Sequence, residues 1–142
     1  MACRDPQHST AVYSQKGDTT ELLRIGWNMQ DPRQVAMFAA RSNTVLIVDV
    51  RVPGTALIAL QSHTQPVNAF SLAPHSSQYI CTGGDDQRAL IWDMHRAAQG
   101  TRGLEPVLRY VASSEVVALE WSTLSQDHIA ICYTNEAQML HV

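Results

Sequence analysis

The sequence predicts an all-β protein made of about three copies of one four-stranded antiparallel meander. Short apolar runs alternate with turns rich in Gly, Asp, Asn, Pro and Ser along the 142 residues. The gaps between these runs are too short for helices, so consecutive strands should pair directly. The pattern also recurs with a period of about 45 residues, which is typical of repeated β-sheet units. Residues 1–142 are therefore expected to form one repetitive domain.

The clearest copy lies at residues 55–93. Its extended runs are 55–60, 67–73, 79–82 and 89–92. The last two runs are separated by Gly83, Gly84, Asp85 and Asp86, and glycines beside aspartates favour a tight reversal of the chain. This copy is therefore expected to contain no helix.

Two weaker copies flank this one, at about residues 8–51 and about residues 105–142. Trp27, Leu72 and Trp121 occupy equivalent places in the three copies. The first run of each copy (9–13, 55–60 and 106–111) is expected to be the outer strand of the preceding sheet. About twelve strands follow from this pattern. They give two complete sheets and a third that lacks its outer strand.

Composition excludes several classes of protein. The chain is 45% hydrophobic and only 16% charged, which is not a disordered composition. A net charge of −3 argues against direct nucleic-acid binding. No apolar stretch reaches membrane-spanning length, and no secretory signal is visible. Cys3, Cys81 and Cys132 lack metal-ligand spacing, and Cys81 and Cys132 are expected to be buried thiols. A reduced compartment, nucleus and cytoplasm, is therefore expected.

The central copy carries a recognisable motif. It ends in Ile-Trp-Asp at Trp92 and Asp93, with Asp86 in the preceding turn and His63 upstream. This pattern resembles the WD repeat, whose unit forms one blade of a β-propeller. The resemblance implies a structural hydrogen-bond chain through His63, Thr82, Asp86 and Trp92. An acid–base pair of His63 and Asp86 is the enzymatic alternative, but the sequence places no nucleophile beside it.

The resemblance extends beyond the motif to one WD-repeat family. The matching segments are residues 8–10, 22–24, 27–28, 30–32, 48–53, 67–68, 73–77, 80–82, 84–86, 89–93 and 129–133. The chain is similar to the C-terminal portion of the family of plant TRANSPARENT TESTA GLABRA and the animal cullin-four-associated WD-repeat factor seven. This resemblance implies a non-catalytic scaffold without cofactors. The implied partners are protein kinases, transcription factors and the adaptor of a cullin-RING ubiquitin ligase.

The ligase contact in such families is tied to a W-D-x-R signature. Two degenerate versions occur here: Val precedes Asp49 and Arg51, and His95 stands where Arg would follow Asp93. Because histidine lacks the guanidinium fork, Arg51 is the better candidate. The segment 95–105 is expected to be a surface loop. The candidate partner-binding residues are Asp49, Arg51, Asp93, Arg96 and Arg102.

Three sheets create a physical difficulty, since propellers close with four to eight blades. Upstream blades or self-association should therefore complete the ring, because open edges favour aggregation. A truncated propeller without independent function is one rival hypothesis. A hydrolase-type enzyme on a propeller is another, and Asp85 with Asp86 could in principle hold Mg²⁺. The surrounding short strands favour the blade turn and no metal site.

Overall fold

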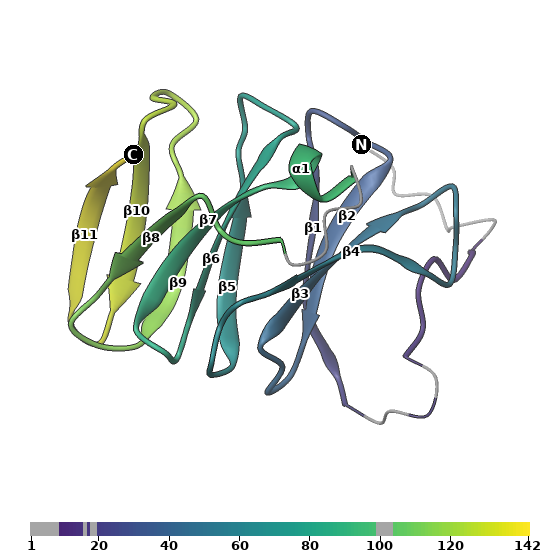
Figure 1. Cartoon of the computed structure of the whole chain (residues 1–142), viewed down its shortest axis with the longest axis horizontal. Helices are drawn as coiled ribbons and strands as arrows, with labels where there is room; N and C mark the ends of the chain where they lie inside the picture. Colours follow the sequence, from purple (N-terminus) through teal and green to yellow (C-terminus); the bar gives the residue numbers. More distant parts are fainter. Residues whose placement is uncertain (1–8, 16, 18–19, 99–103) are drawn as a thin grey trace, which may run out of the picture.

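A computed structural model describes residues 9–15, 17, 20–98 and 104–142. It consists of three antiparallel sheets that stand side by side in a row (Figure 1). The strands are β1 (Leu22–Trp27), β2 (Gln34–Ala39), β3 (Thr44–Asp49), β4 (Ala56–Gln61), β5 (Val67–Leu72), β6 (Tyr79–Gly84), β7 (Arg88–Asp93), β8 (Leu108–Val111), β9 (Val116–Trp121), β10 (His128–Tyr133) and β11 (Glu136–His141). The prediction of an all-β partial propeller is confirmed.

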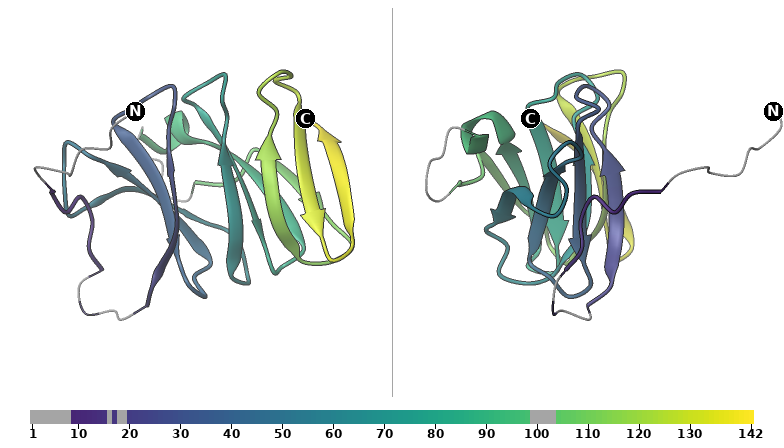
Figure 2. Two further views of the ribbon diagram at one scale, coloured as in Figure 1. Left: turned by 180° about the vertical axis from the view of Figure 1, so that it is seen from behind. Right: turned by 90° about the vertical axis from the view of Figure 1, so that its right-hand side faces the viewer.

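Each sheet is a meander whose strands pair in sequence order. The first sheet is β1-β2-β3-β4, the second is β5-β6-β7-β8 and the third is β9-β10-β11. Two complete sheets and a third without an outer strand were expected from the spacing of the apolar runs. Trp27, Leu72 and Trp121 each end the first strand of a sheet. The sheets stay in the same row when the molecule is viewed from behind (Figure 2).

Apolar side chains fill the two spaces between the sheets. Phe38 and Ile47 of the first sheet form one buried cluster with Ile80, Leu90 and Trp92 of the second. The Phe38 ring also meets Phe70 edge-to-face, with 6.0 Å between ring centroids. A second cluster joins the second and third sheets, and its members include Cys81, Ile91, Val116, Ile129 and Ile131. Burial of each large side chain contributes about 1.5–3 kcal/mol, so packing between sheets is the main stabilising term.

The glycine pair has a different role from the one predicted. Gly83 and Gly84 are the last residues of β6, and the reversal follows at Asp85 to Gln87, where Gln87 has a φ of 65°. A Cβ atom on Gly83 would lie 2.5 Å from Cγ1 of Val116. Glycine is therefore needed here because the third sheet approaches the second so closely.

Three further expectations were wrong. Residues 9–13 form no strand in the described part of the chain, and none of the three sheets there includes them. The segment after β7 begins with a short helix, α1 (Met94–Ala98), where a loop was expected. Cys132 is exposed, since its side of the third sheet has no neighbouring sheet among the described residues. Cys81 is buried as predicted, and burial raises the pKa of its thiol to about 12.

Among the described residues, no helix is long and apolar enough to cross a membrane.

Candidate functional site

The structure brings His63, Thr82, Asp86 and Trp92 together in one hydrogen-bond chain. His63 Nδ1 lies 2.9 Å and 3.0 Å from the two carboxylate oxygens of Asp86. His63 Nε2 lies 2.7 Å from the Thr82 hydroxyl, which also accepts the indole N–H of Trp92 at 2.9 Å. A neutral histidine protonated on Nδ1 satisfies all four groups, since Nε2 then accepts the Thr82 hydroxyl proton. The four side chains form a complete donor–acceptor sequence.

The hydrogen-bond chain is closed to solvent, which limits the roles that it can have. The side chains of His63 and Asp86 are 1% and 2% exposed, and Thr82 and Trp92 are fully buried. Asp86 also accepts the backbone N–H groups of Thr64 and Arg88. These hydrogen bonds therefore link the β4–β5 loop, β6 and β7, and the side chains that form them are not accessible to a substrate. This geometry suits a structural brace.

The other two sheets use apolar side chains at the equivalent positions. Met37 and Val48 replace Thr82 and Trp92 in the first sheet, and both are buried. Ile131 and Leu140 hold these places in the third sheet, where they belong to the core. The polar chain is thus one of two ways in which this fold fills the same space.

Asp85 and Asp86 do not act as a pair. Asp85 accepts a hydrogen bond of 2.7 Å from the Asn68 amide, whereas Asp86 faces His63. Among the described residues, no group of three or more His, Cys, Asp or Glu side chains could hold a metal ion. The two carboxylates are therefore engaged in separate structural contacts.

Asp49 and Arg51 form a fork-to-fork ion pair after β3. Arg51 Nε lies 3.0 Å from Oδ1 of Asp49, and Nη2 lies 2.7 Å from Oδ2. The Arg51 guanidinium lowers the pKa of the Asp49 carboxyl to about 2 through these hydrogen bonds. Because the Arg51 side chain is 59% exposed, its remaining N–H donors face solvent in a fixed orientation.

A second pair of the same kind lies in the β1–β2 turn and was missed by sequence reasoning. Arg33 Nε and Nη2 lie 2.7 Å and 2.9 Å from the carboxylate oxygens of Asp31. The Val50 N–H donates to the Arg33 carbonyl at 2.8 Å, so the two turns are joined. The Asp-x-Arg spacing shared with Asp49 and Arg51 was the available signal.

Asp93 pairs with Arg96, one residue beyond the position at which the W-D-x-R motif has its arginine. Its carboxylate accepts the backbone N–H groups of His95 and Arg96, as an N-cap of α1 does. The Gln78 amide donates to it at 2.9 Å, and Arg96 Nε lies 3.6 Å from Oδ2. The extra helical turn therefore places Arg96, and not His95, beside the carboxylate. Arg102 lies outside the described residues.

These turns are linked at one end of the first two sheets. The Gln30 amide in the β1–β2 turn donates to the carbonyl of Pro74 at 2.7 Å. The Asn28 amide donates to the carbonyl of Ser77, and Asn28 itself is 1% exposed. Asn28 also accepts the backbone N–H of Gln30, which is the local geometry of an Asx turn. We call this surface, formed by Asp31, Arg33, Asp49, Arg51, Asp93 and Arg96, the arginine end.

His75 lies in the adjacent turn and is half-buried. Its ring packs edge-on against Trp121, with 5.6 Å between centroids. Its Nδ1 atom is buried, and among the described residues it has no hydrogen-bond partner.

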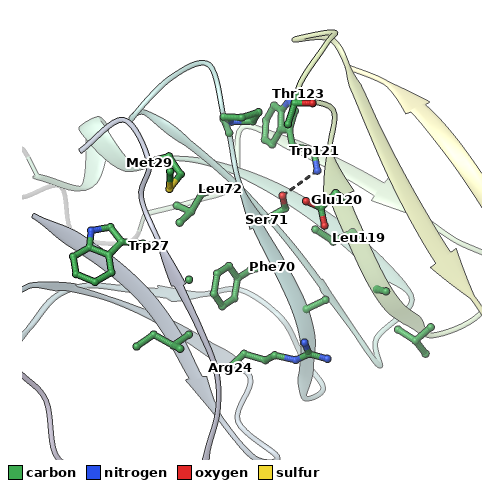
Figure 3. A pocket seen from close by; sticks show the side chains of 17 residues that line it. Arg24, Trp27, Met29, Phe70, Ser71, Leu72, Leu119, Glu120, Trp121 and Thr123 are labelled. Atoms are coloured by element: carbon green, nitrogen blue, oxygen red, sulfur yellow. Dashed lines mark hydrogen bonds between the residues drawn. The ribbon is translucent and has the colours of Figure 1, made fainter. Parts of the chain in front are cut away.

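A groove of about 550 Å³ runs along the first strands of the three sheets, β1, β5 and β9. Phe70 projects into its middle, and Arg24 extends from the first sheet toward the second below that ring (Figure 3). On the other side, the backbone N–H of Trp121 donates to the Ser71 hydroxyl at 2.9 Å. The groove combines apolar walls with an exposed cation and, at Glu120, an exposed anion.

Comparison with known proteins gives the family. No protein-family model matches the sequence. The chain is 40% identical, over 98% of its length, to the DDB1- and CUL4-associated factor 7 homolog of Dictyostelium discoideum. The chain belongs to the WD-repeat family. It spans 42% of the length of that relative. It is also 25% identical, over 93% of its length, to the GATOR2 complex protein WDR24 of Homo sapiens, and spans 16% of it.

The fold of this WD-repeat chain is similar to that of a solved propeller. It matches the β-propeller domain of Cps50 (Swd1) from Myceliophteria thermophila with a TM-score of 0.68 at 14% identity. The match covers 87% of this chain and 38% of that domain. This likeness supports the arrangement of the three sheets as consecutive WD-repeat blades around an axis lined by β1, β5 and β9.

Proposed function

We propose that this WD-repeat chain is a non-catalytic protein-interaction adaptor whose arginine end binds a partner. The observation that carries the proposal is the pair of exposed guanidinium groups, Arg33 and Arg51, each held by its own carboxylate. Their side chains are 54% and 59% exposed. Two donors of each group hold the aspartate, and the remaining donors are available to a second protein.

Pre-orientation makes these arginines effective contacts. A free arginine loses side-chain entropy on binding, whereas a guanidinium already fixed by a carboxylate loses less. The backbone link between Arg33 and Val50 fixes the spacing of the two groups as well. A partner that presents carboxylates or carbonyl oxygens at the same spacing would meet a prepared surface.

The relative's name indicates the class of partner. The Dictyostelium protein is named as a DDB1- and CUL4-associated factor, and we extend this association to the present chain. The partner of the arginine end is then DDB1, the adaptor of a cullin-RING ubiquitin ligase. Protein kinases or transcription factors, the partners implied by resemblance, would bind other surfaces of the chain.

Surface plasmon resonance with purified DDB1 tests the proposal. Arg51→Ala and Arg33→Ala should each weaken binding by about tenfold or more, because a charge-assisted contact contributes roughly 1.5–3 kcal/mol. Arg109→Ala is the matched control, since Arg109 is also half-exposed but lies on the outer strand β8. Equal binding by all three variants, or no binding by the unmodified chain, would refute the proposal.

A further inference from the structure

Two histidines, His128 and His141, stand directly opposite each other on neighbouring strands of the third sheet, β10 and β11. The next pair along, Asp127 and Val142, is hydrogen-bonded, since the Val142 N–H donates to the Asp127 carbonyl at 2.8 Å. Hydrogen-bonded and non-hydrogen-bonded pairs alternate along an antiparallel ladder, so His128 and His141 form a non-hydrogen-bonded pair. Side chains on opposite strands approach each other most closely at such positions.

The two imidazole rings are close enough to share one ion. Their centroids lie 5.1 Å apart, and the ring planes cross at 76°. With a metal–nitrogen bond of about 2.1 Å and an angle of about 90–110° between the two bonds, the centroids of two ligating imidazoles lie about 4.5–5.2 Å apart. The separation of the rings is therefore already that of a two-histidine metal site.

Ser125 orients the ring of His128. Its hydroxyl oxygen lies 2.6 Å from Nδ1 of His128. When His128 is protonated on Nδ1 it donates to this oxygen, and the lone pair of Nε2 stays available to a metal ion. Metal-binding histidines usually donate their second ring N–H in this way, which fixes the tautomer and the ring orientation. Nε2 of His128 and both ring nitrogens of His141 make no hydrogen bond to the residues that the structure describes.

The surroundings of His128 leave room for further ligands. A cavity of about 480 Å³ adjoins the ring, and Glu120 and Ser125 help to line it. Within the described ranges, no third His, Cys, Asp or Glu side chain completes a metal site with the two rings. Water molecules would therefore fill the remaining coordination positions, and the carboxylate of Glu120 contributes negative charge to the cavity that they would occupy.

From this geometry we propose that His128 and His141 bind a divalent transition-metal ion of the Zn²⁺ type. Imidazole nitrogen is a preferred ligand of Zn²⁺, Ni²⁺ and Cu²⁺, whereas Mg²⁺ prefers oxygen. The β10–β11 hairpin is already closed at one end by the turn between Tyr133 and Glu136. The ion would join the two strands at the other end of the hairpin, so it would hold β11 against β10.

Calorimetric titration of the 142-residue chain with Zn²⁺ tests the site. A Cys3→Ser, Cys132→Ser background removes two thiols that would compete for the ion. We expect one tight site per chain for Zn²⁺ and none for Mg²⁺. His128→Ala and His141→Ala should each weaken binding at least tenfold, because a single imidazole does not chelate. His95→Ala is the matched control, since His95 is exposed and lies in α1.

Three results of the titration would overturn the proposal. They are no Zn²⁺ binding by the background protein, equal binding of Mg²⁺, and equal binding of Zn²⁺ by all three histidine variants. Circular dichroism of each variant without metal checks that the loss of binding does not come from unfolding.

Nitrogen NMR of the histidine rings tests the same site without any substitution of a ligand. Addition of Zn²⁺ to the background protein should shift the ring resonances of His128 and His141, with Nε2 of His128 as the ligating atom. The ring resonances of His95 should stay in place. Ser125→Ala should weaken Zn²⁺ binding by about tenfold, because Ser125 only orients the ring. Unshifted resonances of His128 and His141 at saturating Zn²⁺ would overturn the site even if the alanine variants bind more weakly.

Discussion

At the residue scale, the same carboxylate chemistry serves two purposes. Asp86 is buried and orients His63, so its contacts strengthen the core. Asp49 and Asp31 lie at the surface and orient arginines that solvent can reach. The difference follows from position, since a buried polar group needs a partner and an exposed one is free to aim its partner outward. Enzymatic use of Asp86 finds no support in this geometry, because the side chain is closed off from solvent.

Asp86→Ala should lower the stability of the chain. The substitution leaves His63 and two backbone N–H groups without their acceptor in a buried place, at a cost of about 1–3 kcal/mol. Thermal denaturation followed by circular dichroism should therefore show a lower Tm. Asp127→Ala is the control, since Asp127 is an exposed turn residue. A Tm equal to that of the control would mean that the chain of hydrogen bonds contributes no stability.

Arg51→Ala should return the pKa of Asp49 toward its ordinary value. The folded-state pKa is lowered to about 2 by the Arg51 side chain, so the ion pair contributes stability above the unfolded value near 3.8 and loses it as pH falls toward 2. Carbon-detected NMR titration of the carboxyl measures the shift. The pKa of Asp31, which hydrogen bonds to Arg33 lower, should move much less. An unchanged pKa for Asp49 in the variant would contradict the assigned cause.

At the element scale, the sequence was most informative where strands pair locally. The β-strands from Leu22 onward follow from short apolar runs and turn residues, because a meander needs only neighbouring segments. The helix α1 was missed although Asp93 is a suitable N-cap, since five residues give too little periodicity. Exposure of Cys132 and the unpaired state of residues 9–13 depend on which sheets stand next to them. Sequence patterns within one copy cannot report that.

The arginine end was partly predictable. Asp49, Arg51 and Asp93 follow from the motif, but the pairing of Asp93 with Arg96 depends on the helical turn that brings the two together. The pair of Asp31 and Arg33 carries the same spacing as Asp49 and Arg51 yet lies outside the motif. A search for Asp-x-Arg in every turn would have found it.

Gly83→Ala should loosen the contact between the second and third sheets. The added methyl group would lie 2.5 Å from Cγ1 of Val116 and 2.9 Å from Cδ2 of Leu119. Overpacking of this kind typically costs 1–3 kcal/mol, which urea denaturation can measure. Val116→Ala in the same chain should restore part of the loss, because it removes the clashing atom. Purely additive effects of the two substitutions would argue against this steric account.

At the scale of the whole molecule, the three sheets differ in how much support they receive. In the part of the chain that the structure describes, the second sheet has a neighbour on both sides, whereas the first and third each have one. The second sheet also holds the polar chain through Thr82 and Trp92. Stability should therefore be greatest in the middle and fall toward both ends of the row.

Amide hydrogen exchange should display this gradient. Amides of β6 and β7 should exchange most slowly, because both are central strands of the second sheet. Amides of β11 should exchange fastest among the strands, because β11 is an edge strand of the three-stranded sheet, which has a neighbouring sheet on one side only among the described residues. Uniform protection across the three sheets would contradict the gradient.

The brace through His63, Thr82, Asp86 and Trp92 has a consequence for how the chain reaches this structure. All four side chains come from one continuous stretch of sequence. The second sheet can therefore form these hydrogen bonds before the first or third sheet has folded. The first and third sheets lack this hydrogen-bond chain, so they should fold by packing against the second sheet once it has formed. Folding should therefore begin in the second sheet and then extend to the first and third sheets.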